Sequence, residues 1–291
     1  MKFRCKICGY EIEASSLDAN YKCPRCGLDA RYFEEIIEST EDDKKIPIEK
    51  DNPAIARIIE KCINCGRCKD ICENLVGIKY DIKKSKSPVC INCGQCILNC
   101  PVGALVPKYQ YKKVLDYIND TEKIVIVSTS PAVRVALGEE FGMESGTFVE
   151  GKMIASLREL GFDYVLDTTF GADLTIMEEA SELIERLKEG KKLPQFTSCC
   201  PAWVKYMEIY HPNLLPHLST TKSPIGMQGA IIKTYFCEMM GLDKENVISV
   251  ALTPCTAKKY EISREELTEN GVDFVIIFAQ NFLSGMTKIT I

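Results

Sequence analysis

The sequence predicts a multidomain α/β protein in which small cysteine-rich modules precede a larger domain with a parallel sheet. The chain has 291 residues, which is enough for two or three domains. Twelve of its 16 cysteines lie in the first 100 residues, clustered around short C-x2-C units. From residue 121 onwards, apolar runs rich in β-branched residues alternate with amphipathic helical patterns. This alternation is typical of a parallel sheet covered by helices.

Composition narrows the class of protein. The net charge is −5 and lysines alternate with acidic residues, which argues against a nucleic-acid surface. No stretch approaches the roughly 18 apolar residues that a membrane span needs. Residues 1–5 contain no apolar signal core, so we expect a cytoplasmic protein. In a reducing compartment, metal ligation explains clustered cysteines better than disulfides do.

The first module, residues 1–36, carries two C-x2-C-G units. Each unit allows a tight turn that points two sulfurs at one ion, and the glycine permits close backbone approach. Four thiolates make a tetrahedral site that suits one iron or one zinc. The pattern resembles rubredoxin-like domains; we favour mononuclear iron because iron–sulfur motifs follow, with a structural zinc ribbon as the alternative. The four cysteines are Cys5, Cys8, Cys23 and Cys26, and residues 37–54 form a predicted linker.

The second module, residues 55–110, contains an internal repeat. Residues 62–72 and 90–100 both read C-x2-C-x2-C-x3-C, and a proline follows the second run. This is the pattern of ferredoxin-like α+β domains with two 4Fe-4S clusters, in which each run supplies three ligands and the fourth comes from the other run. Zinc sites are the alternative, but zinc knuckles do not use this doubled run. The predicted ligand sets are Cys62, Cys65, Cys68 and Cys100 for one cluster, and Cys72, Cys90, Cys93 and Cys96 for the other.

The third part, residues 120–278, is predicted to be the α/β domain, followed by an atypical tail at 279–291. Ligand sites in such sheets lie where strands end and loops begin. Strands are expected at 123–127, 164–166, 195–198, 247–252 and 274–278, and helices at 131–137, 151–160, 172–188, 203–210 and 224–240.

Two of these predicted strands lead into loops that carry cysteine. One loop reads TSCCPAW at residues 197–203, and the other reads TPCTAKKYE at residues 253–261. Proline and polar residues surround the thiols in both loops, so we interpret the thiols as functional. Cys237 stands alone in an apolar helical stretch, so we interpret it as a buried structural cysteine.

These two loops resemble the first two signature motifs of FeFe hydrogenases. The resemblance covers about residues 55–275, and it includes PAVRVALGEEFG at 131–142, FGADLTIMEE at 170–179 and STTKSP at 219–224. In that family a 4Fe-4S cluster bridged to a two-iron centre, together called the H-cluster, interconverts dihydrogen with protons and electrons. The resemblance implies cluster ligation by Cys200 and Cys255, proton transfer by Cys199, Glu179, Ser219 and Glu182, a hydrogen bond from Lys258 to a cyanide ligand, and a pocket wall at Pro131.

The resemblance has gaps. The family's third motif, which carries two more cluster cysteines, does not occur before Ile291. We therefore expect an incomplete, C-terminally truncated hydrogenase-type domain, through a truncation or a frameshift near Ile276, and no activity of this chain alone. Thr253 stands where methionine is usual, and Ile225 with Gly226 where glutamine or histidine is usual. Both changes resemble sensory members of the family.

Three functional hypotheses follow from the sequence. The first is a hydrogenase, or its electron-input part, that couples electron transfer through 4Fe-4S clusters to reversible dihydrogen and proton conversion. The second is a non-catalytic iron–sulfur protein for electron transfer or for redox or hydrogen sensing. The third is an inactive gene remnant. The expected cofactors are two 4Fe-4S clusters and one mononuclear iron or zinc, with the H-cluster short of two ligands, and the expected partner is a redox protein such as a ferredoxin.

Overall fold

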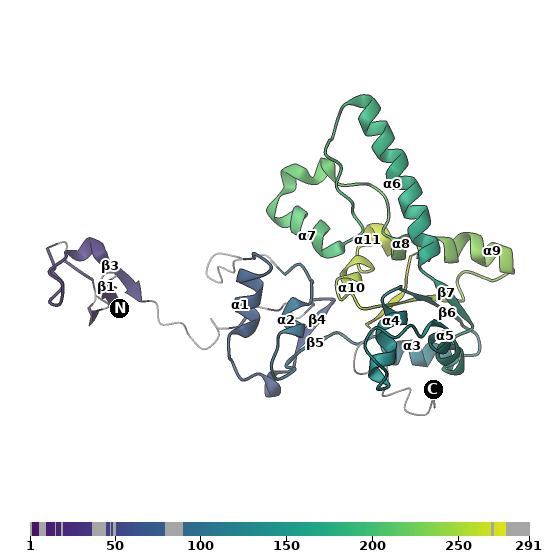
Figure 1. Ribbon diagram of the computed structural model, residues 1–291, viewed down its shortest axis with the longest axis horizontal. Coiled ribbons are helices and arrows are strands. Elements are labelled where there is room, and N and C mark those ends of the chain that lie inside the picture. The colour runs from purple at the N-terminus through teal and green to yellow at the C-terminus, as the bar shows by residue number, and fades with distance from the viewer. Residues whose placement is uncertain are drawn as a thin grey trace.

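The computed structural model of this chain describes residues 2–5, 10–14, 16–18, 20–36, 45–46, 48, 51–78, 90–268 and 271–277 (Figure 1). Cys8, most of the predicted linker and the predicted tail at 279–291 lie outside the described residues. Cys5 is in a described strand, but its side chain is not described. Among the helices of the described residues, none has both the length and the apolar character that crossing a bilayer requires.

The N-terminal module contains a three-stranded antiparallel sheet in the order β2-β1-β3. The strands are β1 (Lys2–Cys5), β2 (Glu11–Glu13) and β3 (Phe33–Ile36), and the 3-10 helix η1 (Ala30–Tyr32) precedes β3. The backbone N–H of Gly27, which has φ of 75°, donates to the carbonyl of Cys23 at 2.8 Å. The second C-x2-C-G unit is therefore a tight turn closed by glycine.

The second module shows the sequence repeat as a structural repeat. Strands β4 (Ile55–Arg57) and β5 (Leu105–Pro107) pair antiparallel, with η3 (Ile59–Lys61) after β4. Helices α1 (Arg67–Asn74) and α2 (Gln95–Leu98) begin inside the two cysteine runs, two residues after the second cysteine of each run. The residue before each helix, Gly66 or Gly94, has a left-handed φ, and so does the asparagine two residues earlier, Asn64 or Asn92.

The C-terminal domain has a four-stranded parallel sheet in the order β7-β6-β8-β9, which confirms the predicted α/β fold. The predicted strand at 195–198 is wrong. Phe196 forms only an isolated bridge with Leu218, because the segment lies outside the sheet and its residues are half-buried or exposed rather than packed in the core. The strands are β6 (Ile124–Thr129), β7 (Tyr164–Asp167), β8 (Val247–Thr253) and β9 (Phe274–Ile277).

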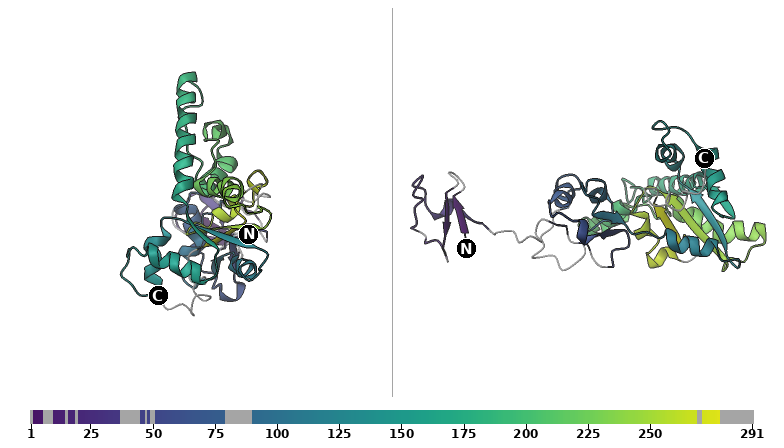
Figure 2. Two further views of the ribbon diagram at one scale, coloured as in Figure 1. Left: turned by 90° about the vertical axis from the view of Figure 1, so that its right-hand side faces the viewer. Right: turned by 90° about the horizontal axis from the view of Figure 1, so that it is seen from below.

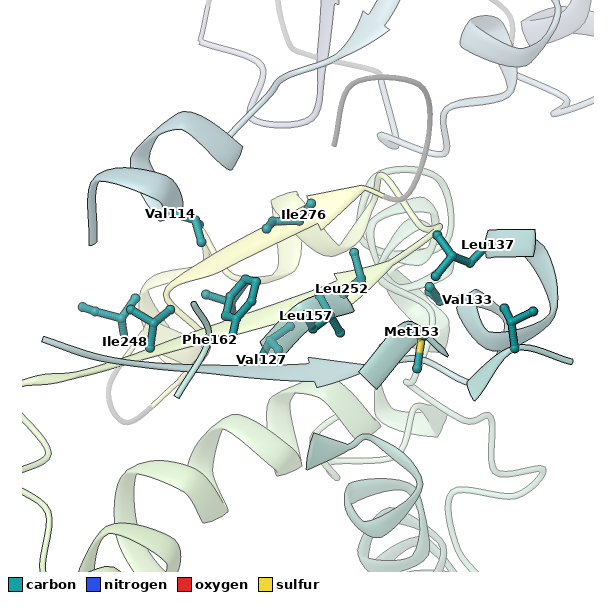
Figure 3. Packing of buried hydrophobic residues seen from close by; sticks show 13 residues of the cluster. Val114, Val127, Val133, Leu137, Met153, Leu157, Phe162, Ile248, Leu252 and Ile276 are labelled. Carbon is teal, nitrogen blue, oxygen red and sulfur yellow. The ribbon is translucent and has the colours of Figure 1, made fainter. Parts of the chain in front are cut away.

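Helices cover both faces of this sheet. On one face, Val127 of β6 and Leu252 of β8 belong to the same core as Leu157 (Figure 3). On the other face, Ile126 packs with Cys237, which is 3% exposed and structural, as expected. The first face is covered by α3 (Tyr111–Ile118), α4 (Val133–Glu140) and α5 (Glu150–Glu159), and the second by α8 (Pro224–Ile231), the π-helix η5 (Ile232–Phe236) and α9 (Cys237–Met240).

The longest helix, α6 (Thr169–Glu189), extends well beyond the sheet (Figures 1 and 2). The other elements of this part are α7 (Pro201–Tyr210), η4 (Pro212–His217), α10 (Lys258–Glu261) and α11 (Glu265–Thr268). Apolar side chains at helical spacing form an exposed stripe on α6, made of Ile176, Met177, Leu183, Ile184 and Leu187.

The close packing of α6 on α8 depends on Gly171. A Cβ at this position would lie 2.5 Å from the carbonyl oxygen of Pro224 and 3.0 Å from Cβ of Gln228. We expect Gly171→Ala to force the helices apart and to lower the free energy of unfolding by about 1–3 kcal/mol. Urea denaturation would measure this. The control is Gly151→Ala on α5, where a Cβ would meet nothing within 4 Å. Equal stability of the two variants would contradict the packing argument.

The strand order places two loops at one edge of the sheet. Strand β7, which follows β6 in the chain, lies on the outer side of β6. Strand β9, which follows β8, lies on the outer side of β8, at the opposite end of the sheet. The carboxyl ends of β6 and β8 are adjacent, since the N–H of Ser130 donates to the carbonyl of Leu252 at 2.9 Å. Pro131 follows the first strand and Cys255 follows the second. Such a reversal of strand order is where α/β sheets bind ligands.

Candidate metal centres

The first cysteine-lined hollow lies in the second module and is open to solvent. Three of its cysteines come from the first run and the fourth comes from the second run. Cys65 is exposed and the other three are half-buried. Basic side chains of Lys45, Arg57 and Arg67 also line the hollow. The four cysteines are Cys62, Cys65, Cys68 and Cys100.

The second hollow is lined by the complementary set of thiols. Its other lining residues are mostly apolar, including Ile55, Ile78 and Ile91. The cysteines are more deeply placed than those of the first hollow, because three of the four are buried. The four cysteines are Cys72, Cys90, Cys93 and Cys96.

The two sets of cysteines differ in how their surroundings shift the pKa of the thiols. Burial, with smaller contributions from neighbouring cysteines, raises the pKa of Cys96 and Cys93. Burial also acts to raise the pKa of Cys100, but backbone N–H groups from 102–105 outweigh it and lower the pKa. One of them, the N–H of Ala104, lies 3.2 Å from Sγ of Cys100. In the second hollow, the N–H of Asn92 donates to Sγ of Cys90 at 3.4 Å.

Both hollows fit a cluster better than a single ion. In the part of the chain that the structure describes, no three His, Cys, Asp or Glu side chains converge closely enough to hold one metal ion. A 4Fe-4S cube takes one cysteine at each iron, so its four thiolates surround a space rather than a point. Backbone N–H groups that point at sulfur are also the hydrogen-bond donors that such clusters accept from.

In the N-terminal knuckle, the structure describes the side chains of two of the four cysteines. Cys23 is buried and Cys26 is half-buried.

The two cysteine loops of the C-terminal domain lie next to each other. Cys200 is the N-cap of α7, with Pro201 in the first turn, and both Cys199 and Cys200 are exposed. Nζ of Lys258 donates to the carbonyl of Cys199 at 2.8 Å and so ties this loop to α10, which follows Cys255. Cys255 and Ala257 of one loop, and Ala202 just after Cys200, pack in the same core cluster as Cys90 and Cys96 of the second hollow. The second hollow therefore borders both loops.

Lys258 has an acidic partner that the sequence interpretation missed. Its Nζ lies 2.7 Å from Oε2 of Glu261, and their side chains are only 9% and 8% exposed. The spacing of three residues on one helix was the available signal. The ammonium group is thus neutralised within the protein.

The predicted proton-transfer residues form two separate groups. Oγ of Ser219 donates to Oε2 of Glu182 at 2.7 Å, and Oε1 of Glu182 pairs with Arg186 at 2.6 Å. Glu179 instead accepts a hydrogen bond from the N–H of Ser198 at 3.4 Å, next to Cys199. Among the described residues, no hydrogen bond joins Glu179 to Ser219 or Glu182. Arg186, which is 7% exposed, was not identified from the sequence.

The positions that depart from the family have structural roles here. Oγ1 of Thr253 accepts a hydrogen bond from the N–H of Cys255 at 3.4 Å. Ile225 is 5% exposed and packs with Ala251 in the core beneath the sheet edge. Gly226 donates its N–H to Oγ of Ser223 at 3.3 Å, which caps α8. Pro131 is exposed after β6.

Glu182 gives a testable dependence of stability on pH. Burial acts to raise its pKa, but hydrogen bonds from Ser219, Arg186 and the backbone of Thr220 outweigh it, so the pKa is lowered. A carboxylate with a lowered pKa in the folded state stabilises the fold above its unfolded pKa of about 4.3, and this contribution is lost as pH falls through the folded pKa.

We therefore expect Glu182→Gln to lower the free energy of unfolding by about 1–3 kcal/mol at pH 7. The difference from the parent protein should shrink as the pH falls below about 4. Urea denaturation across this range measures both effects. Glu185→Gln is the control, because Glu185 is exposed on the same helix. If both substitutions cost the same, Glu182 is only part of a solvated acidic face.

Comparison with known proteins gives a consistent family assignment. The family model described as "Iron only hydrogenase large subunit, C-terminal domain" matches residues 123–283. The NADP-reducing hydrogenase subunit HndD of Solidesulfovibrio fructosivorans is 46% identical over 247 residues, 77% of this chain and 42% of that protein. Iron hydrogenase 1 of Clostridium pasteurianum is 39% identical over 244 residues, 78% of this chain and 42% of that protein.

Solved structures agree with this result. Apo FeFe-hydrogenase HydA1 from Chlamydomonas reinhardtii superimposes with a TM-score of 0.57 at 38% identity, over 60% of this chain and 47% of that one. This chain thus spans less than half the length of each of these proteins.

Proposed function

Because the chain belongs to the iron-only hydrogenase large subunit family, we propose that its second module holds two 4Fe-4S clusters and passes electrons to or from the C-terminal cysteine loops. The observation that carries this proposal is the pair of hollows, each lined by four cysteines that come from both runs of the repeat. The first set would bind one cluster and the second set the other.

The two clusters would form an ordered electron path. Cys65 is exposed at the first hollow, which suits exchange with a redox partner protein such as a ferredoxin. The cysteines of the second hollow are more deeply buried, and this hollow borders the loops of Cys200 and Cys255. Electrons would therefore enter or leave at the first cluster and reach the C-terminal site through the second.

At the C-terminal edge of the sheet, we propose that Cys200 and Cys255 are two ligands of a further cluster. When complete, the H-cluster of this family supplies the interconversion of dihydrogen with protons and electrons. Residues 1–291 provide only these two thiolates, so we propose hydrogenase activity only for a protein in which two more complete the site. Around it, Cys199, Glu179, Ser219 and Glu182 would hold and transfer protons, Lys258 would donate a hydrogen bond, and Pro131 would line the pocket.

The N-terminal knuckle is proposed to hold one iron. The tight turn at Cys23 and Cys26 supports a tetrahedral thiolate site, and a redox-active metal suits a protein with two neighbouring clusters. Zinc in the same site would make the module purely structural.

Iron counting on anaerobically purified full chain tests the proposal. We expect about eight irons from two cubes, plus about one where the knuckle binds iron. Reduction should give electron paramagnetic resonance signals of two 4Fe-4S clusters. A folded, colourless and iron-free preparation would refute the proposal.

A non-catalytic electron-transfer or sensing protein is the second candidate. It is favoured by the exposure of Cys199 and Cys200 and by the pairing of Lys258 with Glu261 inside the protein. Incubation of a protein in which two further cysteines complete the site with the hydrogenase maturation proteins, followed by infrared spectroscopy, separates the two candidates. Carbonyl and cyanide bands support the hydrogenase, whereas their absence with both cubes still present supports electron transfer or sensing.

A further inference from the structure

Asn92, between Cys90 and Cys93, connects three separate segments of the chain. Its side chain is fully buried. Oδ1 accepts a hydrogen bond from Nζ of Lys205 at 2.7 Å, and Nδ2 donates to Oδ1 of Asn52 at 2.9 Å. Its carbonyl oxygen accepts from Oγ1 of Thr256 at 3.0 Å.

The chemistry of the partners fixes the orientation of the Asn92 amide. A lysine ammonium can only donate, so it must face the oxygen. Oδ1 of Asn52 already accepts from the N–H groups of Ala54 and Ile55, so the nitrogen of Asn92 faces an acceptor. The oxygen and the nitrogen of the Asn92 amide therefore both have hydrogen-bond partners in only one of its two orientations. A buried polar contact of this kind fixes how the surrounding segments pack.

These contacts join the second hollow to both cysteine loops of the C-terminal domain. Lys205 lies on α7, which begins directly after Cys200, and Thr256 follows Cys255. The approach is close, since a Cβ on Gly94 would lie 2.4 Å from Oγ1 of Thr256. Gly94 also has φ of 77°, so glycine is required there twice over.

The first repeat provides an internal comparison. Asn64 occupies the same place in Cys-Ile-Asn-Cys and has the same left-handed backbone, with φ of 56° against 61° for Asn92. Asparagine tolerates this conformation better than most residues, which accounts for its presence in both loops. The side-chain oxygen of Asn64, however, is buried without a hydrogen-bond partner. Backbone conformation alone therefore does not explain the contacts of Asn92.

We propose that Asn92 is a positioning residue for electron transfer: it locks the second cysteine loop to the C-terminal domain and holds the Lys205 ammonium beside the second cluster. The inference rests on the proposed function. Reduction adds negative charge to a cluster, so a nearby fixed positive charge favours the reduced form and raises the reduction potential. The same contacts fix the separation between the second cluster and the loops of Cys200 and Cys255.

The test compares Asn92→Gly with Asn64→Gly in the full chain with its clusters assembled. Glycine keeps the left-handed backbone and removes only the side chain. A redox titration followed by electron paramagnetic resonance gives the potential of each cluster, and hydrogen exchange reports on residues 90–96, the loop that the Asn92 side chain joins to Lys205 and Asn52. Asn92→Gly should lower the potential of the second cluster and speed exchange about tenfold, the factor for a loss of about 1.4 kcal/mol. Asn64→Gly should change neither quantity.

A second variant, Lys205→Met, keeps most of the alkyl chain and removes the charge, so it should lower the same potential even if Asn92→Gly fails to fold. An unchanged second-cluster potential in these variants, or equal shifts in Asn92→Gly and Asn64→Gly, overturns the inference. A parent protein that binds no cluster instead overturns the proposed function. Hydrogen exchange then still decides whether Asn92 fastens the loop.

Discussion

Replacing Cys100 with serine is expected to remove one cluster, about four irons, and to leave the other intact. Cys100 belongs to the second run in sequence, but it lines the first hollow with Cys62, Cys65 and Cys68. Cys72→Ser should have the opposite result, because Cys72 lines the second hollow. Each substitution takes one of four thiolates from a cube, and serine is a poor replacement for a thiolate at iron.

The assignment of Cys100 and Cys72 to the two clusters can be tested without knowing which spectroscopic signal belongs to which cluster. If the fourth ligands are exchanged between runs, the cluster that survives in Cys100→Ser matches the one that survives in Cys65→Ser. Likewise, Cys72→Ser matches Cys93→Ser. The measurements are iron content and the spectrum and potential of the remaining cluster. If Cys100→Ser matched Cys93→Ser instead, each run would bind its own cube and the exchange would be refuted.

Replacing Lys258 with methionine is expected to give a large loss of stability, about 3–5 kcal/mol in the free energy of unfolding. The substitution leaves the Glu261 carboxylate buried without its partner, and removing one member of a buried ion pair is strongly destabilising. It also removes the hydrogen bond to the carbonyl of Cys199, so the loop before α7 should become more mobile. Urea denaturation measures the first effect and hydrogen exchange the second.

The control is the double variant Lys258→Met with Glu261→Met. Replacing a whole buried pair with apolar residues is often neutral, so the double variant should regain most of the lost stability. A double variant as unstable as Lys258→Met would show that the ion pair is not the cause.

The sequence was most informative where hydrophobic patterns were long. The runs predicted as strands at 123–127 and 247–252 became β6 (Ile124–Thr129) and β8 (Val247–Thr253). The helix predicted at 172–188 became α6 (Thr169–Glu189). The two strands bury their apolar side chains, so local pattern and tertiary packing agree there, whereas α6 keeps its helical pattern although most of its large apolar side chains are exposed. The short segment at 195–198 has no such pattern, and no strand of the sheet lies beside it.

The candidate sites show a different limit of sequence interpretation. Cysteine spacing identifies thiols that share a turn, because that information is local. The contact between Asn92 and Thr256 joins residues 164 positions apart, and no periodicity records it. Arg186 and Glu261 were missed for a related reason: a charged residue on an amphipathic helix looks solvent-facing until its neighbours are known.

The apolar stripe on α6 also affects how the isolated chain behaves. Ile176, Met177, Ile184 and Leu187 each expose more than half of their surface to water. A contiguous apolar surface is attracted to any similar surface, and salts such as sulfate strengthen that attraction. We therefore expect self-association of the chain to increase with protein concentration and with the concentration of salting-out ions such as sulfate. The apolar stripe on α6 is therefore a reason to keep the chain at low concentration and in a buffer without strongly salting-out ions.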